Sequence, residues 1–208
     1  MTVPEPTIFI VDDDKAVRDS LRWLINSINL KVEAFASASE FLNAYDPEHP
    51  GCLVTDVRMP GMSGLELQKE LSERGIQLPV IIITGHGDVE MAVRAMKGGA
   101  FDFIEKPFPD QNLLDVVQKA VDFDLKARKV RSQQEEILAL LDRLTPRERQ
   151  VLGLIVAGES NKGIAYHLNI SDKTVEAHRA KVMEKTEARS LAELMKKVMV
   201  LETYQGKP

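Results

Sequence analysis

Cysteine is nearly missing from this sequence, since Cys52 is the only one among 208 residues. A single thiol excludes an internal disulfide framework and any metal site built from several cysteines. Long hydrophobic runs are also missing: the longest purely aliphatic run, residues 80–83, falls far short of the roughly 20 residues that span a bilayer. No basic and apolar leader precedes a small-residue cleavage site. We therefore expect a protein of a reducing cytoplasm with no membrane partner.

The composition that is present is that of a folded protein with an uneven distribution of charge. Hydrophobic residues make up 44% of the chain, charged residues make up 28%, and the net charge is −5. Residues 1–120 carry a net charge of −8, whereas residues 121–208 carry +3. The length fits one large or two small domains. An acidic front half and a basic back half favour two modules with different partners, and nucleic acid is a candidate partner for the back module.

Short apolar runs alternate with helical patterns through the front half of the chain. The expected strands are residues 7–11, 31–35, 52–55, 79–84 and 101–105. The segments between them have helical periodicity, with Asp14 and Ser37 as predicted N-caps and Glu40 completing a capping box with Ser37. Strands that alternate with helices in this way predict an α/β domain with a doubly wound, five-stranded parallel sheet.

Polar side chains stand where these expected strands end. Asp12 and Asp13 follow the first strand, Asp56 follows the third, Thr84 ends the fourth and Lys106 follows the fifth. Because ligands of a doubly wound sheet gather at the carboxyl ends of its strands, the pattern predicts a site at that edge. Each residue alone has an ordinary explanation, such as a structural hydroxyl or a surface charge. The set as a whole favours a functional site.

Carboxylates gathered at one edge repel one another and need a cation. An all-oxygen site with open positions suits Mg²⁺, and Mn²⁺ is expected to substitute for it. A carboxylate beside such an ion can attack a phosphoryl group and become an acyl phosphate. Lys106 would neutralise the charge that develops, and Thr84 would hydrogen-bond a phosphoryl oxygen.

Residues 5–125 resemble the receiver domain of bacterial response regulators, which has a flavodoxin-like fold. The resemblance rests on Val-Asp-Asp-Asp at 11–14, Asp-Val-Arg-Met-Pro-Gly-Met-Ser-Gly at 56–64, Ile-Thr-Gly-His-Gly at 83–87 and Glu-Lys-Pro-Phe at 105–108. It implies that Asp56 accepts phosphate from a sensor histidine kinase. It also implies that Asp13, Asp56 and the backbone carbonyl of Arg58 ligate Mg²⁺, with Asp12 acting partly through water.

The resemblance also implies a conformational switch. Lys106 would contact the phosphoryl group and form a cis peptide bond with Pro107. Thr84 would move inward on phosphoryl capture, and Phe103 would rotate into the vacated space, although by strand packing alone Phe103 is an ordinary core residue. Slow autodephosphorylation is expected, so the chain is not a turnover enzyme. A haloacid-dehalogenase-type phosphatase is the alternative, but it needs a second Asp where this chain has Arg58.

The back half of the chain has the pattern of helices. Residues 110–144 predict one long helix or two abutting helices, and residues 126–142 form a linker that is either a solvated spacer or a coiled-coil contact. Thr145, Pro146 and Glu148 form a helix start signal. The expected helices at 161–168 and 172–186 are joined by a short turn, which is typical of a helix-turn-helix.

Residues 143–201 resemble the LuxR-type helix-turn-helix of the NarL/FixJ response regulators. The matching stretches are Leu-Thr-Pro-Arg-Glu-Arg-Gln-Val-Leu at 144–152, Gly-Glu-Ser-Asn-Lys-Gly-Ile-Ala at 158–165 and Ile-Ser-Asp-Lys-Thr-Val-Glu-Ala-His-Arg-Ala-Lys-Val-Met-Glu-Lys at 170–185. The resemblance places the helix at 172–186 in the major groove of DNA. We therefore expect a receiver domain at 1–125, a helical linker at 126–142 and a DNA-binding domain at 143–208.

Three groups of residues are candidates for DNA contacts. The cations of the recognition helix are expected to contact phosphates: Lys173, Arg179, Lys181 and Lys185. Residues at helix starts are expected to add contacts: Asn161, Lys162 and Thr174. Outward-facing residues are expected to face bases: Glu176, Ala177 and Ala180. Glu176 departs from relatives that have a basic residue at this position.

The sequence thus predicts a DNA-binding transcriptional regulator of a two-component system. Its expected partners are a sensor histidine kinase, a palindromic promoter and RNA polymerase. When phosphorylated, it is expected to form a homodimer through the face made by the helix at 89–97 and the strand at 101–105. Two alternatives stay open at this point: a charged helix face that is merely solvated, and an output module that binds protein or RNA instead of a promoter.

Overall fold

The computed structural model describes residues 5–85 and 89–205, and the chain forms two compact units that divide between Arg128 and Lys129. His86 and Gly87 of the motif at 83–87 lie outside the described residues. Across the part of the chain that is described, no helix is both long enough and apolar enough to cross a membrane.

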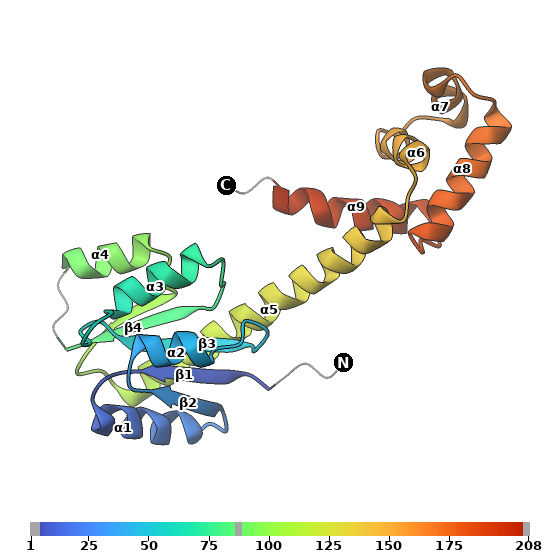
Figure 1. Ribbon diagram of the computed structural model, residues 1–208. Helices are drawn as coiled ribbons and strands as arrows, with labels where there is room; N and C mark the ends of the chain where they lie inside the picture. The colour runs from blue at the N-terminus through green and yellow to red at the C-terminus, as the bar shows by residue number, and fades with distance from the viewer. Residues whose placement is uncertain (1–4, 86–88, 206–208) are drawn as a thin grey trace. The chain divides into compact units, whose positions relative to one another are not determined.

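The first unit is built on a five-stranded parallel sheet with the strand order β2-β1-β3-β4-β5 (Figure 1). The strands are β1 (Thr7–Val11), β2 (Lys31–Phe35), β3 (Gly51–Asp56), β4 (Val80–Thr84) and β5 (Asp102–Glu105). This is the flavodoxin-like order, in which the topological switch point lies between β1 and β3. The predicted doubly wound sheet is confirmed.

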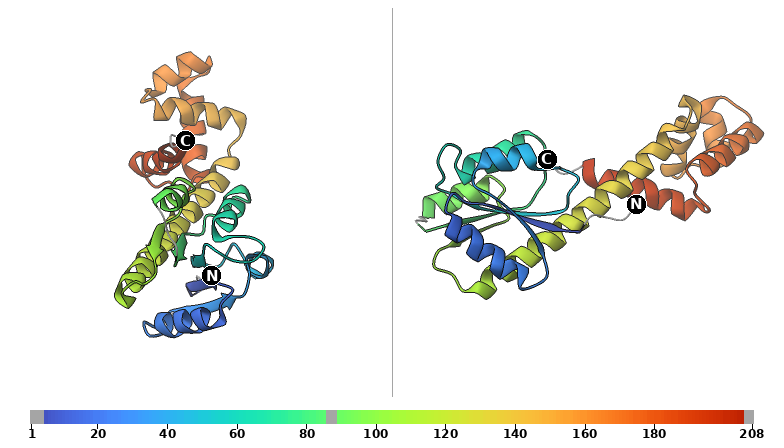
Figure 2. Two further views of the ribbon diagram at one scale, coloured as in Figure 1. Left: turned by 90° about the vertical axis from the view of Figure 1, so that its left-hand side faces the viewer. Right: turned by 60° about the horizontal axis from the view of Figure 1, so that its bottom comes forward.

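Helices cover both faces of this sheet, as Figure 2 shows. They are α1 (Lys15–Asn26), α2 (Ala38–Ala44), α3 (Gly64–Glu73), α4 (Val89–Lys97) and α5 (Asp110–Asp142). Along β1, Ile8 and Ile10 pack with α1 and α5, whereas Phe9 and Val11 pack with α2, α3 and α4. Because side chains of a strand alternate between faces, a continuous apolar run such as β1 suits a sheet that is covered on both sides.

The predicted N-caps are largely confirmed, with one correction. Asp14 caps α1, and Ser37 Oγ accepts a hydrogen bond from the Glu40 amide at 3.2 Å. The capping box predicted for Ser37 and Glu40 is wrong, because Glu40 Oε2 accepts from the amide of Ala36 at 2.7 Å instead. Ser37 is fully extended (φ −154°), whereas Ser63, which does form a capping box at α3, has φ −69°. The local backbone angle therefore decides which amide the carboxylate meets.

A buried ion pair ties α5 to the loop before β3, at the end of the sheet opposite the carboxyl ends of the strands. Asp124, which is 1% exposed, accepts hydrogen bonds from the amide of Gly51 at 2.9 Å and from Arg128 Nε at 2.7 Å. The same guanidinium donates to the carbonyl oxygens of Pro47 at 2.8 Å and His49 at 3.0 Å. The carboxylate of Asp124, the guanidinium of Arg128 and the amide of Gly51 thereby all gain partners, which buried polar groups require.

The second unit is helical and contains the last part of α5. Its other helices are α6 (Pro146–Val156), α7 (Asn161–Leu168), α8 (Asp172–Lys185) and α9 (Leu191–Gln205). Of the two alternatives for residues 110–144, the single long helix is confirmed, because α5 runs unbroken from Asp110 to Asp142. The completely buried side chains of Val151, Ile164 and Val175 belong to the core that joins α6, α7 and α8.

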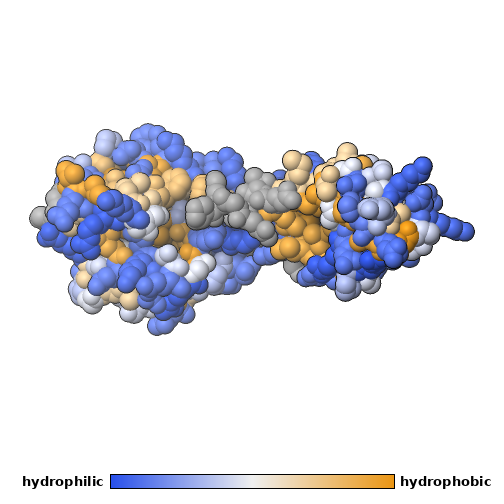
Figure 3. Space-filling view, turned by 90° about the horizontal axis from the view of Figure 1, so that it is seen from above, coloured by the Kyte–Doolittle hydropathy of each residue, from blue (hydrophilic) through white to orange (hydrophobic). Residues whose placement is uncertain are grey.

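Apolar side chains also reach the surface of both units, where they interrupt a largely hydrophilic exterior (Figure 3). On α4, the side chains of Val89, Val93 and Met96 are 82%, 44% and 49% exposed. Their spacing places them along one face of the helix. An exposed apolar stripe of this kind is typical of a surface that contacts another molecule.

Candidate functional site

The residues predicted to form the front-half site lie at neighbouring strand ends. Asp12 directly follows β1, Asp56 ends β3, Thr84 ends β4 and Lys106 directly follows β5. Since these four strands are neighbours and parallel, their carboxyl ends meet at one edge of the sheet. The polypeptide thus places carboxylates, a hydroxyl and an ammonium together, although each comes from a distant part of the chain.

The Lys106 ammonium lies between two carboxylates. Its Nζ is 3.1 Å from Asp56 Oδ1 and 3.5 Å from Asp12 Oδ2. The three side chains are 27%, 13% and 6% exposed, in the order Lys106, Asp56 and Asp12. Because the pair of carboxylates is poorly solvated, the ammonium offsets a repulsion that water would otherwise screen. The site is thus arranged to hold a positive charge beside Asp56.

Asp12 is held in place by several groups. Its Oδ1 accepts from the amide of Asp14 at 2.8 Å, and its backbone carbonyl accepts from Arg18 Nη1 at 2.7 Å. Burial raises the pKa of Asp12 above its ordinary value, and the nearby Asp56 adds to the rise, while the Asp14 amide and Lys106 oppose it. A raised pKa beside a second carboxylate marks a site where more positive charge would be stabilising.

The loop after β3 holds Asp56 from the other side. Asp56 Oδ2 accepts from the amide of Arg58 at 2.6 Å, and the amide of Gly64 donates to the carbonyl of Val57 at 3.1 Å. Gly64 is needed because a Cβ at this position would lie 2.2 Å from the backbone oxygen of Asp56. The close approach of α3 to the end of β3 therefore depends on a residue without a side chain.

Replacing Gly64 by Ala is expected to destabilise the first unit by about 1–3 kcal/mol, since the new methyl group forces the backbone at Asp56 to shift. Urea denaturation of the full chain would measure the change. Gly85→Ala is the matched control in the same unit, because nothing lies within 4 Å of a Cβ added there. Equal stability of the two variants would show that the approach of α3 tolerates a side chain.

The other predicted residues of the site have different surroundings. Asp13 is exposed, whereas Thr84 is 1% exposed and its carbonyl accepts from the Lys106 amide at 2.7 Å. The peptide bond between Lys106 and Pro107 is cis, as the resemblance implies. Phe103 is partly buried against the apolar cluster that includes α3 and α4 residues. Its ring therefore belongs to the face of the sheet that α3 and α4 cover.

The donors at this edge suit a hard cation. Within residues 5–85 and 89–205, no three His, Cys, Asp or Glu side chains are close enough to form a metal site by themselves. Asp12 and Asp56 nevertheless converge on one cation, Asp13 adjoins them in the chain, and the backbone carbonyl of Arg58 belongs to an exposed residue. Mg²⁺ binds one or two carboxylates and completes its shell with water and phosphate oxygens. The residues present fit that requirement.

In the second unit, α8 has one buried side and one exposed side, as the sequence predicts. The side chains of Val175 and Val182 are completely buried, whereas the candidate base-contacting residues are exposed: Glu176, Ala177 and Ala180. Lys173, Thr174 and Lys181 are also exposed, and Lys162 is exposed on α7. Ser171 is the N-cap of α8, with its Oγ accepting from the Thr174 amide at 3.1 Å. The outer face of α8 thus presents small and polar side chains.

The four predicted phosphate contacts on α8 differ in their surroundings. Lys173 is exposed and Arg179 is half-buried. Lys181 pairs with Glu184 at 2.8 Å, and both side chains are mostly exposed. Lys185 pairs with Glu148 at 2.7 Å, and the Glu148 side chain is only 7% exposed. The ammonium of Lys185 is therefore already engaged inside the unit.

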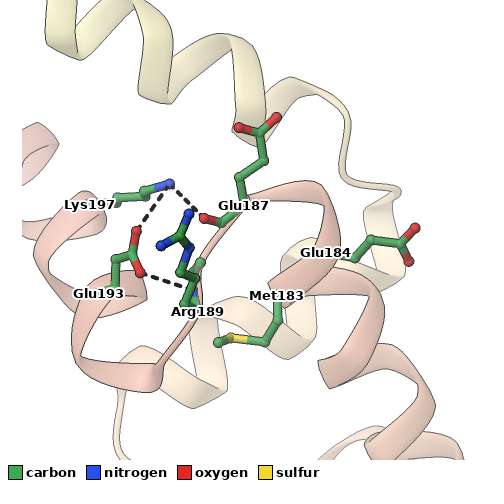
Figure 4. Close-up of a pocket in the computed structure, with 7 residues that line it drawn as sticks. Met183, Glu184, Glu187, Arg189, Glu193 and Lys197 are labelled. Atoms are coloured by element: carbon green, nitrogen blue, oxygen red, sulfur yellow. Dashed lines mark hydrogen bonds and ion pairs between the residues drawn. The ribbon is translucent and has the colours of Figure 1, made fainter.

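The turn between α8 and α9 contains contacts that the sequence did not predict (Figure 4). Lys197 Nζ donates to the carbonyl oxygens of Thr186 at 2.7 Å and Glu187 at 3.2 Å, and Glu193 accepts from the Arg189 amide at 2.9 Å. An ammonium at the carboxyl end of a helix donates to carbonyls that have no partner within the helix. Its positive charge also interacts favourably with the negative end of the helix dipole. Lys197 thus stabilises the end of α8. Its position in the sequence does not predict this contact, because Lys197 belongs to the next helix.

Two family models match the chain, one in each half. The model for the response regulator receiver domain matches residues 8–118, and the model for bacterial regulatory proteins of the luxR family matches residues 142–198. The first match covers every predicted phosphorylation-site residue, and the second covers every predicted DNA-contact residue.

Relatives resemble the chain over nearly its whole length. Transcriptional regulatory protein TdiR of Thauera aromatica is 47% identical, covering 93% of this chain and 85% of the relative. Transcriptional regulatory protein FixJ of Azorhizobium caulinodans is 48% identical, covering 93% and 92%. Among solved structures, response regulator StyR matches with a TM-score of 0.86 and 46% identity over 97% of this chain and 100% of its own. Full-length FixJ from B. japonicum matches with a TM-score of 0.58 and 43% identity over 95% and 98%.

Proposed function

Because the chain belongs to the two-component response regulators that join a receiver domain to a LuxR-type DNA-binding domain, and is a transcriptional regulator rather than a turnover enzyme, we propose that Asp56 is its phosphorylation site. In this proposal a sensor histidine kinase donates the phosphoryl group. The phosphorylated receiver then dimerises, and the dimer binds a palindromic promoter in the cytoplasm, where RNA polymerase is a further partner.

The observation that carries the proposal is the ammonium of Lys106, 3.1 Å from Asp56 Oδ1. An Asp56 oxygen attacks phosphorus, a P–O bond forms, the P–N bond to the kinase histidine breaks, and its electron pair leaves with the imidazole. Lys106 stabilises the charge on the transferring phosphoryl oxygens. Water attack on the aspartyl phosphate accounts for slow autodephosphorylation.

A divalent cation completes this site in the proposal. The donors that would hold Mg²⁺, or Mn²⁺ in its place, are the carboxylates of Asp12, Asp13 and Asp56 and the backbone carbonyl of Arg58. When bound, the ion supplies positive charge against the phosphoryl oxygens. The raised pKa of Asp12 supports this assignment, because a carboxylate in so buried a position gains from a second cation.

The response to phosphorylation begins at Thr84 and Phe103. The Thr84 hydroxyl would turn toward a phosphoryl oxygen, and Phe103 would move into the space that it leaves. Phe103 packs against the apolar cluster that includes Ala95 of α4, and the exposed Val93 and Met96 of that helix belong to its apolar stripe. A second copy of the chain that covers this stripe would remove the apolar area from water and stabilise the dimer.

Beryllofluoride, an analogue of the phosphoryl group, is expected to convert the native chain from monomer to dimer and to strengthen binding to a palindromic duplex. Binding should weaken steeply as salt rises, since each neutralised phosphate releases counterions. Size-exclusion chromatography and fluorescence anisotropy across a salt series would measure both effects. If the protein left no footprint on promoter DNA, that result would favour an output module that binds protein or RNA instead.

Two exposed lysines, one on α8 and one on α3, provide a test variant and its control for the salt series. Lys173→Ala is expected to lower the slope of log affinity against log salt by about 2, because each of the two copies in the dimer loses one phosphate contact. Lys69→Ala should leave the slope unchanged, since Lys69 is also an exposed lysine but pairs with Glu73 on α3 of the receiver. Equal slopes for Lys173→Ala and the native chain would remove Lys173 from the DNA interface.

A further inference from the structure

Two consecutive residues in the first turn of α6 contact the last residue of α7 and the last residue of α8. Arg147 Nη2 donates to the carbonyl of Leu168 at 2.5 Å, directly before the turn that leads into α8. Glu148 Oε2 accepts from Lys185 Nζ at 2.7 Å, at the last residue of α8. A single turn of α6 thus holds the entry to α8 on one side and its end on the other.

The carboxylate that receives Lys185 also completes the capping box of α6. Glu148 Oε2 accepts from the amide of Thr145 at 2.8 Å, and Thr145 Oγ1 accepts from the amide of Glu148 at 3.3 Å. The Lys185 hydrogen bond, followed by that of the Thr145 amide, lowers the pKa of Glu148 to about 2. The carboxylate therefore stays ionised, and the ion pair persists, throughout the physiological pH range.

Contact of Lys185 with a DNA phosphate would disrupt this arrangement. The Glu148 side chain is 7% exposed and the Lys185 side chain 29% exposed, whereas those of Glu184 and Lys181 are 67% and 59% exposed. If Lys185 turned to DNA, it would leave a nearly buried carboxylate with one partner fewer, which is costly. Lys181 can leave Glu184 without that cost, because water replaces the lost contact.

We propose that Glu148 and Lys185 are positioning residues for DNA recognition, which fix the last turn of α8 against the first turn of α6, and that Lys185 is not a phosphate contact. The completely buried Val182, one turn before Lys185, and the 1% exposed Thr186 support this role, since they anchor the same end of α8 in the core. Base readout requires the side chains of α8 to keep a fixed pitch in the groove. The ion pair maintains that pitch from the inner side of the helix.

The test compares Lys185→Met and Glu148→Gln with the native full chain. The probes are a palindromic duplex selected from a random library by the native protein and a scrambled duplex of equal length. Glutamine can still accept from the Thr145 amide, so Glu148→Gln removes the charge and keeps the cap. Circular dichroism at the binding temperature would verify that each variant is folded before its affinity is measured.

We expect each variant to bind the selected duplex about tenfold more weakly, an effect comparable with the loss of one base contact. The scrambled duplex should lose less affinity, and the salt slope should not change. The double variant should bind no more weakly than either single variant, because both act through one contact. Lys181→Met is the matched control, expected to lower the salt slope by about 2, because each copy in the dimer loses one phosphate contact.

Two results would overturn the proposal. In the first, Lys185→Met lowers the salt slope by about 2, as removal of one phosphate contact from each copy in the dimer does. In the second, folded Glu148→Gln binds the selected duplex as tightly as the native chain or more tightly, which would mean that Lys185 is released to the DNA. Either result returns Lys185 to the group of phosphate contacts.

Discussion

The Asp56→Ala variant is expected to take up no phosphoryl group from acetyl phosphate above background. Asp56 supplies the oxygen that forms the bond to phosphorus, so no neighbouring group replaces it once the side chain is removed. Asp12 is the nearest alternative carboxylate, but its Oδ1 is occupied by the Asp14 amide and its pKa is raised by burial. Lys106 would stay beside Asp12, but the site would have no nucleophile for the phosphoryl group.

Intact-protein mass spectrometry after incubation with acetyl phosphate and Mg²⁺ would measure this loss. Asp46→Ala is a suitable control, because Asp46 is an exposed carboxylate in the loop before β3, away from the carboxyl ends of the strands. It should be labelled as the native chain is. Native-level labelling of the Asp56→Ala variant would contradict the proposed phosphorylation site. In that case the convergence of Asp56 and Lys106 would have to serve another purpose.

Removal of the buried carboxylate of Asp124 is expected to have the largest effect on stability. Asp124→Ala should lower the free energy of unfolding of the receiver by about 3–5 kcal/mol, the usual cost of breaking a buried ion pair. The substitution leaves the amide of Gly51 without its acceptor and the guanidinium of Arg128 without its counter-charge. The backbone of Thr7 lies directly beside Gly51, since a Cβ added there would be 1.8 Å from the carbonyl oxygen of Thr7.

Urea denaturation of the full chain, followed by a probe for each unit, would measure the change. The receiver transition should move to lower urea concentration while that of the DNA-binding unit stays in place. Asp122→Ala is a close control, since Asp122 lies on the same helix, is exposed and accepts only a hydrogen bond from Gln118 at 3.3 Å. Surface changes of this kind stay within about 0.5 kcal/mol. Equal midpoints for the two variants would show that the Asp124–Arg128 pair does not stabilise the receiver.

Local patterns in the sequence determined most of the fold. A continuous apolar run such as β1 predicts a strand covered on both faces, and Thr145 with Pro146 predicts the start of α6, because these features depend on neighbours in the chain. The edge that gathers Asp56 and Lys106 was also predictable. Parallel strands bring their carboxyl ends together whatever the details of packing.

The tertiary structure decided the contacts between distant charged residues. The i,i+4 spacing of Asp124 and Arg128 on α5 permits an ion pair, but nothing in it predicts that the pair is buried against Gly51. Lys185 has the pattern of any lysine on an exposed helix face. The sequence gives the charge of such a residue, but the partner of that charge depends on how helices and loops pack. Even for the local pair of Ser37 and Glu40, a backbone angle decided that no capping box forms. Hydrophobic periodicity specifies which face of an element is buried, whereas the pairing of polar groups is decided only when those faces meet.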